Sequence, residues 1–245
     1  IIIFGGNGFI GKHLHKRLMI RNKVYSFGNK KYSNSGKNLV LYNKSNFLRI
    51  FKNIKPDVIF FLSGNSYPNN TINDENYDFE TNNIILQQLL SALIEIKYTK
   101  LFLYTSSIAV YGNIKTKKSI NEKHKLDPLS FYGSSKLIAE KQIEFISKKC
   151  KFKSIVLRLS SIYGPGLRRQ IVYQILKQAT KGKPLILNGS ILDSRQFLYV
   201  EDCVEMFNAL IYLKHSKFEI FNISFGNKIK IIDIINYAQI FLRKK

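Results

Sequence analysis

The sequence predicts an α/β protein whose core is a doubly wound parallel β-sheet. Apolar runs alternate along the chain with longer stretches of helical periodicity, which is the pattern of strands joined by crossover helices. The runs are hydrophobic at successive positions, as in strands that helices cover on both faces. With 245 residues, of which 45% are hydrophobic, the chain can bury one large core and a smaller second lobe.

The predicted elements follow one another in a regular order. We expect strands at residues 1–4, 24–27, 38–42, 58–62, 101–105 and 154–159. We expect helices at residues 9–20, 47–53, 77–96 and 131–149, followed by mixed structure. Pro56 and Pro128 stand shortly before a predicted strand and a predicted helix, where the missing backbone N–H costs little.

The opening string IIIFGGNGFIG predicts a strand, a tight turn and the start of a helix. Gly5, Gly8 and Gly11 allow the backbone to approach a ligand closely, and Phe9 and Ile10 begin the helix. Such a turn directs backbone N–H groups and the positive end of a helix at a pyrophosphate. Because Rossmann-type nucleotide folds begin in this way, we expect the turn to bind a dinucleotide.

A tyrosine and a lysine in the string FYGSSKLIAEK form a second candidate feature. Tyr132 and Lys136 share one face of the predicted helix, so the ammonium can lower the pKa of the phenol from about 10 toward neutrality. Hydroxyl groups also cluster in TSSIAVYG, where the apolar run KLFLY ends. Because doubly wound sheets bind ligands at the carboxyl ends of their strands, we expect Ser107 to hydrogen-bond a substrate oxygen beside Tyr132.

Almost from end to end, these strings resemble the extended short-chain dehydrogenases/reductases, the branch that includes nucleotide-sugar epimerases and dehydratases. GGNGFIG matches the G-x-x-G-x-x-G of that family, and PDVIFFLSG, with Leu62, resembles the strand that ends beside the adenosine and ribose. ETNNIILQQLL resembles the helix that carries a supporting asparagine, here Asn82. SSIAVYG and YGSSK supply the serine, tyrosine and lysine positions, which are Ser107, Tyr132 and Lys136.

The resemblance also implies a division of the chain. LRLSSIYGPG resembles the segment that leaves the cofactor domain, and SRQFLYVEDCVEMF places Arg195 at the arginine that usually binds the diphosphate of a sugar nucleotide. We expect a cofactor domain at residues 1–163 with 197–224, and a substrate lobe at 164–196 with 225–245. The chain is short for this family, so we expect a truncated lobe. Family members commonly form homodimers, which we expect here as well.

The chemistry expected of this set is the oxidation of a sugar hydroxyl. A nicotinamide takes a hydride from carbon only if the hydroxyl proton leaves at the same time. Tyr132 would remove that proton, Ser107 would hold the oxygen, and Lys136 would stabilise the phenolate and hydrogen-bond the nicotinamide ribose. Asn82 would brace the surroundings of Lys136. The resemblance implies that the substrate is a nucleotide-linked hexose, oxidised at C4.

The two residues that directly follow Ser107 help to distinguish the possible reactions. Family dehydratases carry an Asp–Glu pair there, whereas this chain has Ile108 and Ala109, which cannot donate a proton, so we do not expect a 4,6-dehydratase. We rank a 4-epimerase first, because SSIAVYG and YGSSK most resemble that subgroup. An NADPH-dependent 4-keto-sugar reductase is the alternative. A truncated member that binds a nucleotide without turnover is a third possibility.

The end of the second predicted strand bears on the cofactor. Family epimerases usually have an aspartate there that binds both ribose hydroxyls of NAD. Here Asn29, Lys30 and Lys31 follow the strand, and two ammonium groups stand where the 2′-phosphate of NADP would bind. The lysines slightly favour NADP, but loop lysines are common in so lysine-rich a chain, and both cofactors remain open.

The high charge does not by itself indicate a nucleic-acid partner. The net charge is +23 and the pI about 9.9, but the lysines are scattered, without a long basic block or an interleaved aromatic stripe. No stretch approaches the ~20 apolar residues of a membrane helix, and no leader is visible. Cys150 and Cys203 suit a reduced cytoplasmic protein, and the four histidines form no metal-ligand pattern. We therefore expect a cytoplasmic enzyme without metal, membrane or nucleic-acid partners.

Overall fold

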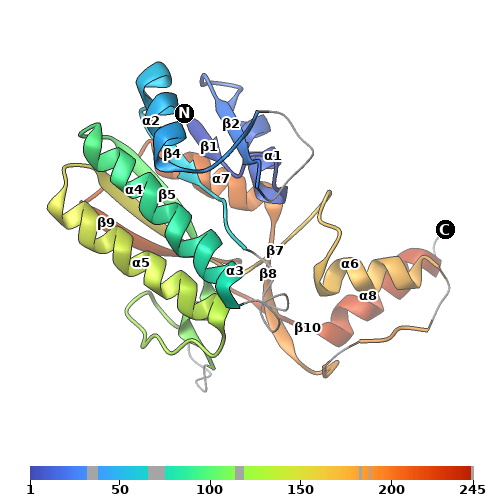
Figure 1. The fold of residues 1–245 in the computed structure, drawn as a ribbon. Helices are drawn as coiled ribbons and strands as arrows, with labels where there is room; N and C mark the ends of the chain where they lie inside the picture. The colour runs from blue at the N-terminus through green and yellow to red at the C-terminus, as the bar shows by residue number, and fades with distance from the viewer. Residues whose placement is uncertain (32–37, 66–74, 114–118, 182–183, 188, 244–245) are drawn as a thin grey trace. The chain divides into compact units, whose positions relative to one another are not determined.

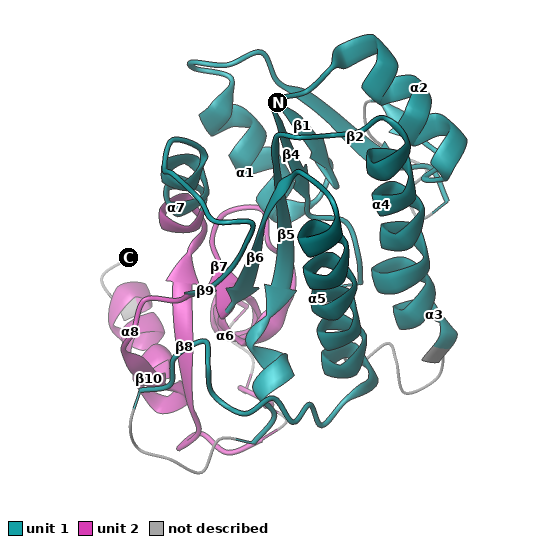
Figure 2. Cartoon of the chain, turned by 90° about the vertical axis from the view of Figure 1, so that its left-hand side faces the viewer, with its two compact units in different colours: residues 1–159, 204–222 teal, residues 160–203, 223–245 magenta. Residues whose placement is uncertain are grey.

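The computed structural model describes residues 1–31, 38–65, 75–113, 119–181, 184–187 and 189–243, which Figure 1 shows as ribbon. The chain divides into two compact units, coloured teal and magenta in Figure 2. The first unit comprises Ile1–Leu159 and Val204–Asn222, and the second comprises Ser160–Cys203 and Ile223–Lys245. The described helices include none that is long and apolar enough to cross a membrane.

The first unit is built on a seven-stranded sheet with the strand order β3-β2-β1-β4-β5-β6-β9. Its strands are β1 (Ile2–Phe4), β2 (Tyr25–Asn29), β3 (Leu39–Val40), β4 (Val58–Phe61), β5 (Leu101–Ser107), β6 (Lys153–Leu159) and β9 (Phe218–Ile223). β1 is parallel to both of its neighbours, and the pairs β2–β3, β4–β5 and β5–β6 are parallel as well. From the centre of the sheet, β1, β2 and β3 follow one another toward one edge, and β4, β5 and β6 follow one another toward the other edge. This order confirms the predicted doubly wound sheet.

Helices cover both faces of this sheet. They are α1 (Phe9–Leu18), α2 (Lys44–Ile54), α3 (Glu75–Phe79), a π-helical turn η2 (Glu80–Ile84), α4 (Ile85–Glu95), α5 (Phe131–Lys149) and α7 (Val200–Ile211). Figure 2 shows α2, α4 and α5 on one face and α1 and α7 on the other. The core on the first face contains Phe4, Phe47, Leu89 and Ile143, all fully buried. On the second face Phe60 of β4 stacks on Phe207 of α7, with 6.1 Å between ring centroids.

The helix predicted at 131–149 is confirmed as α5 with the same bounds. Its start is fixed because the Ser130 hydroxyl accepts a hydrogen bond from the Gly133 N–H at 3.0 Å. The helix predicted at 77–96 is interrupted instead by η2. A π-helical turn accommodates one extra residue, and here it lets the consecutive Asn82 and Asn83 both reach Ser135 of α5, at 3.0 and 2.9 Å.

The second strand is longer than predicted and the third is shorter. β2 extends to Asn29, where it still pairs with Val40 of β3. The predicted strand 38–42 is reduced to Leu39–Val40 because Tyr42 leaves the sheet edge and directs its hydroxyl to the carbonyl oxygen of Phe27, at 2.6 Å. β3 has a partner on one side alone, so fewer hydrogen bonds hold its ends.

The second unit has a three-stranded sheet with the order β10-β8-β7. Its strands are β7 (Ser161–Tyr163), β8 (Ser194–Tyr199) and β10 (Lys228–Lys230), and its helices are α6 (Gln170–Ala179) and α8 (Ile231–Arg243), which pack on each other (Figure 1). β8 is parallel to β7 and antiparallel to β10. Ile175, Phe197, Ile231 and Ala238 form its small core.

Candidate active site

The glycine-rich turn joins β1 to α1 through unusually close backbone contacts. The N–H groups of Gly5 and Gly6 both donate to the carbonyl oxygen of Phe27, at 2.9 and 3.1 Å. A Cβ at Gly11 would lie 2.3 Å from the Gly5 carbonyl oxygen, so no side chain fits there. At Gly8, which is exposed at the start of α1, a Cβ would meet that same oxygen, at 3.1 Å, and no other atom of the described residues within 4 Å. The turn is therefore packed on its inner side and open beside Gly8.

A tyrosine that the sequence analysis did not identify holds this turn in place. The Tyr42 hydroxyl accepts a hydrogen bond from the Gly5 N–H at 2.9 Å and donates one to Phe27. Burial raises the pKa of Tyr42, which keeps its hydroxyl able to donate. Phe9 and Ile10 are half-buried in the first turn of α1, directly after the braced segment. The one sequence signal for Tyr42 is a polar group at the end of the apolar run LVLY.

The end of β2 places the residues predicted to contact the adenosine side of a cofactor. Asn29 is buried, and its side-chain oxygen accepts a hydrogen bond from the Lys31 N–H at 3.1 Å. Lys30 is exposed, whereas the Lys31 ammonium forms an ion pair with Glu80 of η2. On the other side of β1, Leu62 follows β4 and donates its N–H to Phe4 at 2.9 Å. Sequence spacing gave no sign of the contact between Lys31 and Glu80.

Lys136 is buried beside two tyrosines. Its ammonium nitrogen donates to the hydroxyl of Tyr104 at 3.2 Å and to the carbonyl oxygen of Thr105 at 3.1 Å. It lies 5.9 Å from the centroid of the Tyr132 ring, as expected for neighbours on one helix face. Burial lowers the pKa of Lys136 to about 8, while the charge of Asp78 opposes this shift. The ammonium group therefore remains mostly charged at neutral pH.

Ser107 is the last residue of β5, opposite Leu159 of β6. Its hydroxyl oxygen accepts a hydrogen bond from the Ala109 N–H at 3.1 Å and so caps a short 3-10 helix, η3 (Ile108–Tyr111). This segment touches the start of α5, because a Cβ at Gly133 would lie 2.7 Å from the Ala109 carbonyl oxygen. Ser107 is thus held close to the first turn of the helix that carries Tyr132.

Asn82 and a glycine that the sequence analysis missed enclose the Lys136 ammonium. Asn82 is fully buried, and its side-chain N–H donates to the Ser135 hydroxyl at 3.0 Å. Its side-chain oxygen has no hydrogen-bond partner among the described residues. A Cβ at Gly64, which has φ +148°, would lie 2.3 Å from that oxygen and 3.3 Å from the Lys136 nitrogen. The sole sequence signal for Gly64 is a glycine shortly after a strand.

Arg195 belongs to the second unit, whereas the other candidate residues belong to the first. It is exposed on β8 and opposite Ile229 of β10. Its role in substrate binding remains a prediction. Across the described parts of both units, no group of three or more His, Cys, Asp or Glu side chains is arranged to hold a metal ion.

The first unit has the features that a dinucleotide cofactor requires. Gly5, Asn29 and Leu62 lie at the carboxyl ends of β1, β2 and β4, and Ser107 ends β5. These strands are parallel, so the four residues lie along one edge of the sheet, where doubly wound folds bind ligands. The open side of the turn at Gly8 and the N-terminus of α1 suit a pyrophosphate. The buried side-chain oxygen of Asn82, which has no hydrogen-bond partner in the described parts of the chain, adds an acceptor near Lys136.

Comparison with known proteins identifies relatives with different activities. The chain is 28% identical to an uncharacterized UDP-glucose epimerase of Bacillus subtilis, over 98% of this chain and 81% of that protein. It is also 28% identical to the dTDP-4-dehydro-6-deoxyglucose reductase of Escherichia coli, over 100% and 82% of the two chains. The dTDP-D-glucose 4,6-dehydratase of Dictyostelium discoideum is again 28% identical, over 96% and 62%.

Solved structures and a family model agree on the fold. The crystal structure of a UDP-glucose 4-epimerase from Thermotoga maritima with UDP-glucose has a TM-score of 0.86 and 25% identity, over 97% of this chain and 81% of that one. The model of the NAD dependent epimerase/dehydratase family matches residues 1–224. That match covers most of the chain and establishes the family, whereas relatives of equal identity are named for different reactions and leave the reaction open. The chain belongs to the NAD dependent epimerase/dehydratase family.

Proposed function

We propose that this protein is an NAD-dependent 4-epimerase of nucleotide-linked hexoses. The observation that carries the proposal is the buried Lys136, which lies beside Tyr132 on α5 and is hydrogen-bonded to β5, the strand that ends at Ser107. A charged ammonium next to a phenol favours the phenolate, which is the form that accepts a proton. UDP-glucose, which is bound in the similar Thermotoga maritima enzyme, is the first substrate to test.

Each residue of the candidate site has a defined task in this reaction. Tyr132 removes the proton from the C4 hydroxyl of the sugar and later returns it. Ser107 hydrogen-bonds the same oxygen, and the Lys136 ammonium stabilises the Tyr132 phenolate. When bound, the nicotinamide cofactor supplies the acceptor and then the donor of the hydride. Asn82, whose side-chain N–H donates to Ser135 on the same helix as Lys136, braces the surroundings of the ammonium group.

The residues after Ser107 support epimerisation over dehydration. Elimination of water from the sugar needs an acid and a base beside the C5–C6 bond. Ile108 and Ala109, the first residues of η3, have no side-chain group that exchanges a proton. The reductase remains the second candidate, supported by the Escherichia coli relative at 28% identity.

We propose NAD as the cofactor, in preference to NADP. Selection between the two depends on the charge beside the 2′ position of the adenosine ribose. Lys31, one of the two lysines that favour NADP in the sequence, is paired with Glu80 and its charge is thereby compensated. The family match to NAD dependent enzymes agrees with this choice.

For the substrate side, we propose that Arg195 binds the diphosphate of the nucleotide sugar. It is exposed on β8, so its planar guanidinium is accessible to form two parallel hydrogen bonds with phosphate oxygens. Arg195→Ala should raise the KM for the nucleotide sugar and leave the affinity for NAD unchanged. Unchanged kinetics in this variant would remove Arg195 from the site.

We also propose that the protein forms a homodimer through α5. Phe131, Ile138 and Phe145 are 55%, 42% and 61% exposed and lie seven residues apart, so they form one apolar stripe along the helix. A second copy of the chain would cover this stripe with its own. Ile138→Glu should then give a monomer in size-exclusion chromatography with light scattering; a monomeric parent protein would contradict the proposal.

Product analysis tests the proposed reaction. The purified protein is incubated with UDP-glucose and other nucleotide sugars, with NAD or NADPH, and both the sugar products and the oxidised or reduced cofactor in solution are measured. An epimerase converts the sugar without net change in cofactor, whereas a reductase consumes NADPH in proportion to product. Tyr132→Phe serves as the inactive control. Net NADPH consumption with a 4-keto sugar would contradict the epimerase and support the reductase.

A further inference from the structure

A buried ion pair lies one helical turn beyond Lys136. The side chains of Glu140 on α5 and Arg158 on β6 are 2% and 1% exposed. Nε and Nη2 of Arg158 donate to the two carboxylate oxygens of Glu140, at 3.0 and 2.7 Å. Such a bidentate pair fixes the relative orientation of its two partners.

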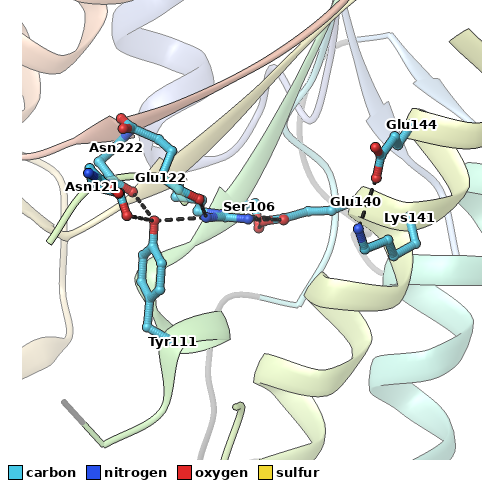
Figure 3. Close-up of polar contacts among 9 residues, drawn as sticks. Ser106, Tyr111, Asn121, Glu122, Glu140, Lys141, Glu144 and Asn222 are labelled. Carbon is cyan, nitrogen blue, oxygen red and sulfur yellow. Dashed lines mark hydrogen bonds and ion pairs between the residues drawn. The ribbon is translucent and has the colours of Figure 1, made fainter. Parts of the chain in front are cut away.

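Further hydrogen bonds extend from both partners, as Figure 3 shows. Ser106 of β5 donates to Glu140 at 2.5 Å. Nη1 of Arg158 donates to the Tyr111 hydroxyl at 2.8 Å, and the guanidinium carbon lies 4.9 Å from the centroid of that ring. The Tyr111 hydroxyl donates in turn to Asn222 of β9, at 2.7 Å. The network therefore connects α5, β5, η3, β6 and β9.

Three members of this network adjoin residues of the candidate active site. Ser106 directly precedes Ser107, and Tyr111 ends the short helix that Ser107 caps. Glu140 follows Lys136 by four residues on the buried face of α5. Consequently the strand end that carries Ser107 is tied to Glu140 through Ser106, and the helix that carries Lys136 and the end of η3 are both tied to Arg158.

We propose that Glu140 and Arg158 are positioning residues, which hold Ser107 at a fixed distance from Tyr132 and Lys136. This inference rests on the proposed function of those three residues. A need for stability alone would not explain the pair, because well-packed apolar side chains often stabilise a core as well as a buried ion pair does. Orientation is what the bidentate contact adds, and an error of about 1 Å at a reacting group can cost on the order of 10²-fold in rate.

The charges around Lys136 determine how the pair must be tested. Tyr104 of β5, Tyr132 and Glu140 of α5, and Asp78 of α3 face the ammonium group. Asp78 and Glu140 both favour its charged form, so removal of Glu140 alone would change charge as well as position. A variant that removes Glu140 and Arg158 together leaves the net charge unchanged and leaves neither member of the pair buried without the other.

The test compares the double variant Glu140→Leu with Arg158→Met against Glu144→Gln. Glu144 lies one turn further along α5, where it pairs with Lys141 and Lys148 at 2.9 and 2.7 Å on the exposed side. Figure 3 shows the first of these contacts. We expect the double variant to fold and bind NAD like the parent but to lose about tenfold or more in kcat with UDP-glucose. The Glu144→Gln variant should match the parent in all three properties.

A folded double variant with parental kcat would overturn the inference. Should the double variant not fold, Ser106→Ala removes one hydroxyl next to Ser107 and should lower kcat about three- to tenfold at unchanged NAD affinity. Parental kcat in Ser106→Ala would then overturn it.

A readout independent of turnover separates this inference from the proposed function. Ultraviolet absorbance is measured against pH for the parent and the double variant, and for each of them with Tyr132→Phe added. The difference within each pair gives the alkaline titration of Tyr132. In the double variant it should shift to higher pH, because a less firmly held Lys136 stabilises the phenolate less. Absence of sugar turnover in the parent would count against the proposed function alone. An unchanged Tyr132 titration in the double variant would count against the positioning role.

Discussion

The ammonium nitrogen of Lys136 donates a hydrogen bond to the hydroxyl of Tyr104, 3.2 Å away. The same nitrogen lies 5.9 Å from the ring centroid of Tyr132, which precedes Lys136 by one turn of α5. Tyr104 is fully buried on β5, and burial raises its pKa well above the usual value of about 10. It therefore stays neutral and acts as an acceptor for Lys136. Two phenols thus adjoin one ammonium group, and we propose that Tyr104 holds this group while Tyr132 exchanges the proton.

The first prediction compares these two phenols. Tyr132→Phe should lower kcat by about 10² to 10⁴, because it removes the group that carries the proton. Tyr104→Phe removes one hydrogen bond to Lys136 and should lower kcat about tenfold or less. Both variants should bind NAD like the parent in a fluorescence titration. If the two variants lose equal activity, Tyr132 has no special role as proton carrier.

The second prediction concerns pH, because burial lowers the pKa of Lys136 from 10.5 to about 8. Between these two values the unfolded chain binds a proton that the folded protein lacks, so this group makes the free energy of unfolding rise with pH. Over the same range Lys136 loses the charge that stabilises the Tyr132 phenolate, and kcat should fall. Rate and stability should therefore respond to Lys136 in opposite directions above about pH 8.

Lys136→Met isolates this effect, since methionine fills similar space without titrating. The variant should be inactive, and its Tm should rise less than that of the parent, or fall more steeply, between about pH 8 and pH 10. Thermal unfolding followed by circular dichroism at several pH values gives both slopes. Equal slopes for the two proteins would show that Lys136 does not titrate in this range.

Local patterns in the sequence were sufficient to predict the frame of the site. Alternating apolar runs and helical periods predicted the doubly wound sheet, because strands buried on both faces must be hydrophobic throughout. The spacing of Tyr132 and Lys136 predicted that they share a helix face, and the bounds of α5 agree with the prediction. Position at a strand end predicted that Ser107 lies on the same sheet edge as the glycine turn.

Contacts between residues distant in sequence were not predictable in the same way. Tyr104 reads as one more core residue of the run KLFLY, and its contact with Lys136 joins positions 32 residues apart. Gly64 approaches Asn82, which lies in η2, and nothing in the string ETNNI marks a π-helical turn. Such contacts depend on tertiary packing, which short-range spacing does not report.

The third prediction uses Gly64, where an added Cβ would lie 2.3 Å from Asn82 and 3.3 Å from the Lys136 nitrogen. Gly64→Ala should displace one or both side chains and lower kcat on the order of 10²-fold. Gly226→Ala is the matched control, because Gly226 also has positive φ, +92°, but its Cβ would meet no atom of the described residues within 4 Å. Steady-state kinetics and thermal unfolding of both variants separate displacement from backbone strain. Equal loss of activity in the two variants would contradict the role of Gly64.

The fourth prediction concerns the choice between NAD and NADP at the end of β2. The Lys31 ammonium pairs with Glu80, and both side chains are partly exposed, at 49% and 38%. Glu80→Gln removes a negative charge beside this ammonium and so strengthens its attraction for a 2′-phosphate, and the affinity for NADP relative to NAD should rise about two- to fivefold. Lys31→Gln in the same background should abolish this gain, because the positive charge is then absent.

A second exposed ion pair provides the control for this cofactor experiment. Lys44 and Glu95 pair at 2.8 Å with similar exposure, 48% and 49%, so Glu95→Gln makes the same change in charge at another position. Equilibrium titration with each cofactor at fixed salt measures the affinity ratio, since the attraction between exposed charges depends on ionic strength. The ratio should change for Glu80→Gln and stay at the parental value for Glu95→Gln. A ratio that Glu80→Gln leaves unchanged would mean that Lys31 does not contact the 2′ position, and Lys30 would then be the lysine to replace.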